Sequence, residues 1–195
     1  MNEEDWIARQ SQTYVTNGYG ETSRALKSNE RYSRVLEAHL PAEARILDLG
    51  CNDGSFCKVL AAKGYVVTGV DLPAVIERAS ADYPELDLVA ADIENLDWPE
   101  RTFDVVVAFG IIEHIMHDFE LLKKAYSWLN PCGQIFLTTP LSPEKIGGDH
   151  LRFYPPVSLS QLATLAGFKV SQVEIFQDID EYLIVGEKNG RKSIP

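Results

Sequence analysis

The chain has 195 residues, 45% of them hydrophobic and 24% charged, and a formal net charge of −11 at pH 7. This length suits about one domain with a core of its own, and the composition is that of a globular protein. The acidity disfavours nucleic-acid binding, which needs clustered Lys and Arg to neutralise phosphates. No apolar run approaches the roughly 18 residues that span a bilayer, and the acidic start is unlike a signal peptide, so a cytoplasmic protein without a membrane span is expected.

Residues 1–43 are predicted to form an N-terminal segment that ends in a helix. No clear hydrophobic period runs through residues 1–27, whereas the apolar residues of 29–40 recur at helical spacing. Pro41 follows and favours the end of the helix at that point.

Residues 44–188 are predicted to form one domain, with residues 189–195 as a C-terminal tail. The stretch R-I-L-D-L-G-C-N-D-G-S-F at Arg45–Phe56 indicates a strand, a small-residue loop and the start of a helix. Because loop glycines let a ligand approach the main chain and N–H groups at a helix start are unpaired, this junction predicts a small-molecule site. Later apolar runs and helical patterns predict strands at 65–70, 86–90, 103–109, 134–139, 169–176 and 182–187, and helices at 55–63, 73–79, 119–129 and 158–167.

Two local signals predict where helices end or begin. Asn130-Pro131 is expected to close the helix of 119–129. Ser158-x-x-Gln161 has the spacing of a capping box and is expected to start the helix of 158–167.

Strands alternating with helices predict an α/β fold with a doubly wound, mostly parallel seven-stranded sheet and a C-terminal antiparallel hairpin. In such a sheet a ligand binds outside the carboxyl ends of the strands, near the topological switch point. The segments to examine are therefore those at predicted strand ends: Asp48 to Gly54, Asp71, Asp92, Phe109 to His114, and the loop after Thr139.

Four segments carry a family resemblance in the expected order: D-L-G-C-N-D-G, V-D-L, A-D-I and F-D-V-V-V-A-F-G-I-I-E-H-I, with L-N-P-C-G-Q-I-F-L after them. From about Arg45 to Lys188 the chain resembles a class I S-adenosylmethionine-dependent methyltransferase of the small-molecule type. The resemblance implies a Rossmann-like fold, S-adenosylmethionine as cofactor and S-adenosylhomocysteine as product. The spacing G-x-N-x-G argues against NAD, whose loop has the spacing G-x-G-x-x-G.

The resemblance also implies a set of cofactor-binding residues, each with a chemical reason. Asp48 supplies negative charge near the methionyl ammonium, and Asp71, 23 residues later, can accept the ribose hydroxyls. Asp92 and the Ile93 N–H suit the adenine; both aspartates have a helix cap as the alternative role. Asn52 stands where the family has a glycine, and Asn tolerates a positive φ. The predicted set is Asp48, Gly50, Cys51, Asn52, Gly54, Asp71, Leu72, Asp92, Ile93 and Phe109.

Glu113, His114 and His150 are the predicted catalytic residues, as bases for a hydroxyl acceptor. Glu113-His114 is similar to the end of an E-x-x-E-H pattern linked to a divalent metal in ubiquinone-biosynthesis O-methyltransferases. Because Gly110 takes the first acidic position, a metal at Glu113 and His114 is kept only as an alternative, and no metal ligand is assigned. The three cysteines form no CxxC pair, which argues against a zinc site built on cysteines. The alternatives are structural: Glu113 and His114 hold the next helix start, and His150 caps or orients Glu113.

Five further residues are predicted to bind the acceptor. Arg152 and Tyr154 lie in the segment D-H-L-R-F-Y and either hold a polar acceptor or pack the loop. Tyr14, Tyr19 and Arg24 belong to a predicted N-terminal lid, with a solvated tail as the alternative.

The prediction for the whole chain is a methyltransferase, monomeric or homodimeric, that methylates a small-molecule acceptor. O-methylation by direct in-line transfer is expected, because methyl transfer from a sulfonium mainly requires alignment and exclusion of water. The alternative is a cofactor-binding protein without catalytic activity that serves as a regulator or partner.

Overall fold

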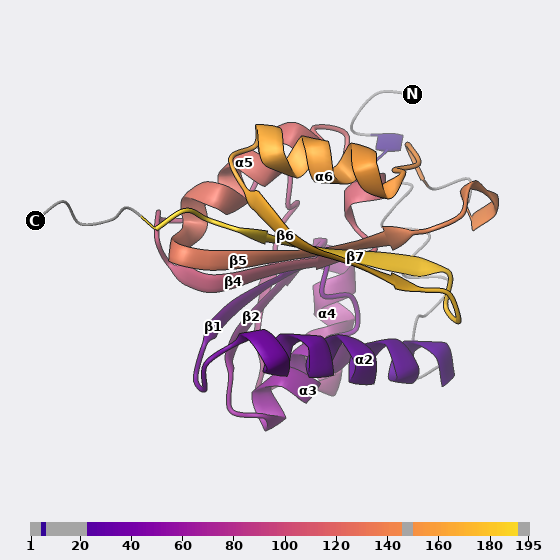
Figure 1. The fold of residues 1–195 in the computed structure, drawn as a ribbon. Helices are drawn as coiled ribbons and strands as arrows, with labels where there is room; N and C mark the ends of the chain where they lie inside the picture. Colours follow the sequence, from indigo (N-terminus) through magenta and orange to yellow (C-terminus); the bar gives the residue numbers. More distant parts are fainter. Residues whose placement is uncertain (1–4, 7–22, 146–149, 191–195) are drawn as a thin grey trace, which may run out of the picture. The chain divides into compact units, whose positions relative to one another are not determined.

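The computed structural model describes residues 5–6, 23–145 and 150–190 (Figure 1). The chain forms two compact units, Met1–Leu96 and Asp97–Pro195, each with strands and helices of its own. In the described part of the chain, no helix combines the length and apolar character needed to cross a membrane.

The first unit is built of parallel strands in the order β3-β2-β1, connected by helices. In the register of these strands Asp48 lies beside Gly69, and Asp71 lies beside Ala90. Two predicted ligand-binding carboxylates therefore stand at or near strand ends, as expected. The elements are α2 (Ser23–His39), β1 (Arg45–Leu49), α3 (Ser55–Ala62), β2 (Val66–Asp71), α4 (Pro73–Asp82) and β3 (Asp87–Ala90).

The second unit has the strand order β4-β5-β7-β6, in which β4 and β5 are parallel and β7 is antiparallel to both of its neighbours. Helices α5 and α6 lie side by side along these strands, with α5 on β5 and α6 on β6 and β7 (Figure 1). The elements are β4 (Phe103–Phe109), η1 (Ile112–His114), α5 (Asp118–Trp128), β5 (Leu129–Pro140), η2 (Pro143–Lys145), α6 (Pro156–Leu165), β6 (Lys169–Phe176) and β7 (Glu181–Glu187).

The apolar runs of the sequence become the buried strands. Val105, Val106 and Val107 of β4 are fully buried, as their nearly continuous apolar run predicted. Ile46 and Leu47 of β1 are buried as well. The predicted α/β fold class with seven strands is confirmed, and so is the antiparallel C-terminal hairpin of β6 and β7.

The predicted end of α5 at Asn130-Pro131 is wrong in detail. The helix ends at Trp128, and β5 already begins at Leu129. The pairing of β5 with β4 is irregular here, since Phe103 pairs with Leu129 but Val105 with Gln134. The Asn130 side chain donates to Asp104 at 2.8 Å and holds the extra residues as a bulge in the strand.

The predicted capping box of α6 is also wrong. The helix begins at Pro156, two residues before Ser158, and its N-cap, Pro155, makes no side-chain cap hydrogen bond. Proline at the first helical position suits a helix start, because its φ is preset and the missing N–H would have no intrahelical partner. The Pro-Pro sequence, which the capping-box prediction overlooked, is the stronger start signal.

Candidate functional site

The loop after β1 turns back on β2 through positive backbone angles. The N–H groups of Gly50 and Cys51 both donate to the Val70 carbonyl, at 2.8 and 3.1 Å. Gly50, Asn52 and Gly54 have φ values of 74°, 49° and 77°. Asn52 therefore adopts the left-handed conformation that a glycine would, which Asn tolerates better than most residues.

Asp71, at the end of β2, fixes this loop by hydrogen bonding. Its carboxylate accepts hydrogen bonds from the Asn52 N–H at 2.8 Å and from the Leu72 N–H at 2.7 Å. The helix-cap alternative does not apply in its usual form, because the N-cap of α4 is Leu72. Burial raises the pKa of Asp71, whereas the two N–H donors oppose that shift. Each oxygen keeps a further lone pair with which to accept a ligand hydroxyl.

Asp48 lies buried in β1, and the thiol of Cys57 donates to its Oδ2 at 3.2 Å. Burial is the main cause that raises the pKa of Asp48 to about 7; the Cys57 hydrogen bond lowers it, and the nearby charge of Asp71 raises it. A bound cation beside Asp48 would favour its ionised form. The carboxylate is thus suited to an ammonium ligand.

Cys57 and Gly69 support this site, although the sequence interpretation assigned neither a role. A Cβ on Gly69 would lie 2.8 Å from Cys57 Sγ and 2.9 Å from Cys51 Cβ. Only a residue without a side chain lets β2 pack this closely against α3 and the loop. A glycine inside a β-branched strand was the available signal.

Asp92 follows β3 and organises its own turn. Its carboxylate accepts from the Glu94 N–H at 3.0 Å and from the Asn95 side chain at 2.7 Å. Asp92 thus caps a local turn, a role similar to the helix cap that was its structural alternative. Adenine binding by Asp92 stays a prediction. Ile93 is half-buried beside it.

In the second unit, the segment after β4 brings Glu113 and His114 to His150. Glu113 is 2% exposed in η1, and its carbonyl accepts from the Leu151 N–H at 2.8 Å. The rings of His114 and His150 meet edge to face, with centroids 4.6 Å apart. One ligand atom from each of these three residues lies within 4.8 Å of the other two. The structure therefore gathers the three predicted catalytic residues.

Two flanking residues were missed in the sequence, Thr138 and Tyr182. Gly110, with φ 64°, donates its N–H to both the carbonyl and the hydroxyl of Thr138, which fixes the exit from β4. Tyr182 is fully buried and donates to the Tyr154 carbonyl at 2.7 Å. Burial and then the negative charge of Glu113 raise the pKa of Tyr182, so its phenol stays protonated. Neither residue belongs to a recognisable motif.

Arg152 and Tyr154 are both engaged with Asp118 at the start of α5. The Arg152 guanidinium and the Tyr154 hydroxyl each donate to the Asp118 carboxylate, and Arg152 also donates to the Met116 carbonyl at 3.1 Å. These contacts fasten the segment after His150 to the helix. They match the loop-packing alternative, and acceptor binding by these two residues stays a prediction.

Phe109, at the end of β4, is half-buried. Tyr14 and Tyr19 lie outside the described residues, and of Arg24 only the backbone in α2 is described. The lid hypothesis therefore stays a prediction.

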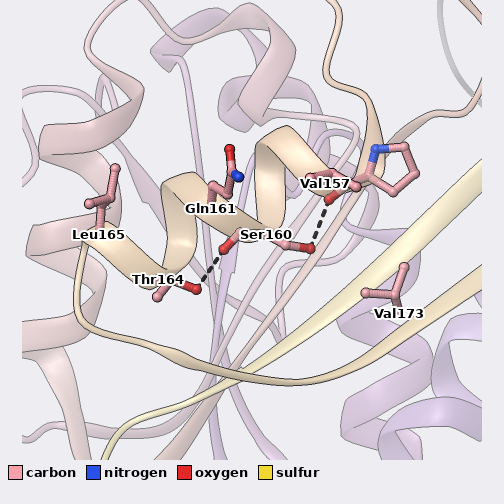
Figure 2. A pocket seen from close by; sticks show the side chains of 7 residues that line it. Val157, Ser160, Gln161, Thr164, Leu165 and Val173 are labelled. Carbon is pink, nitrogen blue, oxygen red and sulfur yellow. Dashed lines mark hydrogen bonds between the residues drawn. The ribbon is translucent and has the colours of Figure 1, made fainter.

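A groove of about 570 Å³ lies elsewhere in the second unit, between α6 and β6 (Figure 2). Its walls include Val157 and Leu165 of α6 and Val173 of β6. The hydroxyls of Ser160 and Thr164 donate to backbone carbonyls of α6 itself, each at 2.8 Å. Among the described residues that line this groove, none has a titratable side chain, so the groove offers no acid-base chemistry.

Comparison with known proteins identifies relatives by sequence. A family model described as "Methyltransferase domain" matches residues 21–173. A Mycolicibacterium smegmatis protein described as a "Probable S-adenosylmethionine-dependent methyltransferase" is 29% identical over 71% of this chain and 56% of its own length. A Bradyrhizobium diazoefficiens protein described as "Ubiquinone biosynthesis O-methyltransferase" is 31% identical over 49% of this chain and 39% of its own length. The chain thus spans about half the length, or less, of these curated relatives.

Solved structures share the fold. One is described as a SAM-dependent methyltransferase from Archaeoglobus fulgidus, with a TM-score of 0.70 and 21% identity over 85% of this chain and 95% of that one. Another is described as the [4+2]-cyclase SpnF, with a TM-score of 0.73 and 14% identity over 96% of this chain and 95% of that one. At these identities the likeness shows the fold alone.

Proposed function

Because the chain belongs to the methyltransferase-domain family, we propose that it transfers a methyl group from S-adenosylmethionine to a hydroxyl group of a small molecule. The carbon–sulfur bond of the sulfonium breaks as a carbon–oxygen bond forms in line with it. The hydroxyl proton passes to a base, and S-adenosylhomocysteine leaves. The family predicted from the motifs is confirmed. The methyltransferase activity and its methyl donor are part of the proposal, and the description of the Mycolicibacterium relative supports them.

The loop of the first unit supports binding of the methyl donor. Asp48 offers a carboxylate to the methionyl ammonium, and the loop Gly50 to Gly54 presents backbone to the same part of the ligand. Asp71 keeps lone pairs for the ribose hydroxyls while its two N–H partners hold the loop. Binding of S-adenosylmethionine by these residues is part of the proposal.

The observation that carries O-methylation is the cluster of Glu113, His114 and His150. Their ligand atoms lie within 4.8 Å of one another, and Nδ1 of His150 is buried and accepts or donates no hydrogen bond within the described part of the chain. His150 is therefore available to receive a proton from the acceptor. The Bradyrhizobium relative, an O-methyltransferase by its description, is consistent with a hydroxyl acceptor.

The test combines donor binding with turnover. Calorimetry measures S-adenosylmethionine affinity, and formation of S-adenosylhomocysteine is followed on a panel of phenols, alcohols, amines and thiols. His150→Gln should lower kcat about 100- to 10,000-fold on hydroxyl acceptors with unchanged donor affinity. His39→Gln, on the exposed face of α2, is the matched control. Failure to bind the donor would refute the proposal, and so would full activity of His150→Gln.

A non-catalytic, cofactor-binding role is the second candidate. The fold alone does not decide between the two candidates, because a protein described as a cyclase shares it. Tight donor binding without turnover on the whole panel would support this second role. Cytoplasmic location, a monomeric or homodimeric state and the absence of nucleic-acid partners stay predictions from the sequence.

A further inference from the structure

Glu113, His114 and His150 form a compact set of one carboxylate and two imidazoles. Glu113 and His114 belong to η1, and His150 comes from a segment far along the chain. The hydrogen bond from the Leu151 N–H to the Glu113 carbonyl, 2.8 Å long, ties the two segments together next to the cluster. Backbone thus holds the three side chains in one place.

The distances are close to those of a metal site. Two ligand atoms on a tetrahedral ion, each about 2.1 Å from it, are about 3.4 Å apart. The ligand atoms here lie within 4.8 Å of one another, so side-chain rotation has to shorten each separation by at most about 1.4 Å. Two imidazoles on one ion have ring centroids about 4.5 to 5.5 Å apart; the rings of His114 and His150 are 4.6 Å apart.

A buried ring nitrogen is a second, independent observation. Nδ1 of His150 has no hydrogen-bond partner within the described residues. A buried polar atom without a hydrogen-bond partner destabilises the folded state, and native protein interiors seldom retain one. A metal ion would satisfy such an atom without a donor proton.

The donor set decides the kind of ion. Two imidazole nitrogens and one carboxylate oxygen suit first-row transition ions such as Zn²⁺, Co²⁺ or Fe²⁺, whereas Mg²⁺ and Ca²⁺ prefer oxygen ligands alone. Three protein ligands also leave at least one coordination position open, as in catalytic zinc sites.

We propose that Glu113, His114 and His150 together bind one divalent transition-metal ion, with Zn²⁺ as the representative, and leave an open position on it. From the sequence, a metal at Glu113 and His114 is only an alternative, because Gly110 lacks a carboxylate; the structure offers His150 as the third ligand instead. This role rests on the proposed O-methylation: with the ion bound, His150 would serve as a ligand instead of as the base, and an acceptor hydroxyl at the open position would lose its proton more readily, to solvent.

Metal binding is tested directly on the full-length chain with Cys132→Ser, because the exposed Cys132 thiol would otherwise bind Zn²⁺ on its own. The protein is freed of metal and titrated with Zn²⁺ against a chromophoric chelator. One ion per chain is expected, with no displacement by excess Mg²⁺. Binding of Co²⁺ should give visible absorption bands of a site with nitrogen and oxygen ligands.

Variants identify the ligands. His150→Gln and His114→Gln should each weaken Zn²⁺ binding at least about 10- to 100-fold, whereas His39→Gln should leave it unchanged. Circular dichroism checks that each variant is folded, and the Co²⁺ spectrum of the Cys132→Ser parent gives an answer that needs no substitution at a proposed ligand. Absence of one-to-one Zn²⁺ binding would overturn the proposal. So would folded His150→Gln and His114→Gln variants that bind Zn²⁺ as tightly as their parent.

The metal proposal and the methyl-transfer proposal fail separately. Zn²⁺ binding without methyl transfer would leave the metal site standing and refute the proposed activity. Full methyl transfer by metal-free protein that binds no Zn²⁺ would support the proposed activity and refute the metal site.

Discussion

At Asn52 the main chain makes the contact that matters. Its φ of 49° is left-handed, and its N–H donates to Asp71 at 2.8 Å. Asn52→Gly keeps both features, so donor affinity measured by calorimetry should stay within about threefold of the parent. Asn52→Pro removes the N–H and forces a negative φ, and should abolish binding. Loss of binding in a folded Asn52→Gly variant would show that the Asn side chain touches the ligand.

Asp48 should make stability fall as pH rises towards neutrality. Its folded pKa, raised to about 7, lies above the ordinary aspartate pKa of 3.8. Between these values the folded state holds a proton that the unfolded chain has released, so the free energy of unfolding decreases through this window. The full cost, complete above about pH 7, is of the order of 4 kcal/mol.

Asp48→Asn should remove this dependence. Urea unfolding from about pH 5 to about pH 7.5 should show the variant gaining stability over the parent as pH rises, since the amide is never ionised. Asp82→Asn, at the exposed end of α4, should follow the parent curve. A constant difference between parent and Asp48→Asn across the range would contradict the assignment.

At the scale of elements, β2 reaches the glycine loop and α3 through Gly69. A Cβ there would be 2.8 Å from Cys57 Sγ and from Leu88 Cδ2. Gly69→Ala should therefore lower the free energy of unfolding by about 1–3 kcal/mol and also weaken donor binding, because the loop has to shift.

Gly64→Ala is the matched control for this effect. A Cβ on Gly64 would meet nothing within 4 Å, but its φ of 90° is unfavourable for alanine. It should cost about 1–2 kcal/mol of stability without altering donor affinity. Urea unfolding and calorimetry on both variants give the comparison, and equal donor affinity in the two would count against the packing argument.

Elements with a clean hydrophobic pattern were predictable from the sequence. β4 and β6 have the predicted bounds, Phe103–Phe109 and Lys169–Phe176. Burial of both faces requires a continuous run of apolar residues and burial of one face requires alternation, so both patterns can be recognised in the local sequence. The start of β5 was not predictable, since its bulge depends on the contact of Asn130 with Asp104 in another strand. Contacts of this kind leave no local period.

For the whole molecule, the net charge of −11 at pH 7 predicts self-repulsion. Adding NaCl from about 10 to about 200 mM should raise Tm by a few degrees at pH 7, because the Debye length shortens from about 30 to about 7 Å. The effect should vanish near the isoelectric point of about 4.8. Thermal scans at both pH values measure it, and a fall of Tm with salt at pH 7 would mean that attractive surface pairs dominate.

The sequence by itself determined the α/β fold class, most strand positions and the family. Short stretches of sequence indicate each of these: apolar residues at regular spacing, the glycine loop of Arg45–Phe56, and acidic residues at strand ends. It also named Glu113, His114 and His150, and it offered contact between His150 and Glu113 only as an alternative.

Only the tertiary structure decided what these residues have as neighbours. It brought His150 against Glu113 and His114, engaged Arg152 and Tyr154 with Asp118, and gave Gly69 its tight packing. The physical reason is that such contacts join residues distant in the chain, and their geometry follows from the path of the whole backbone. A local sequence pattern records which face is buried but not which distant side chain lies on it.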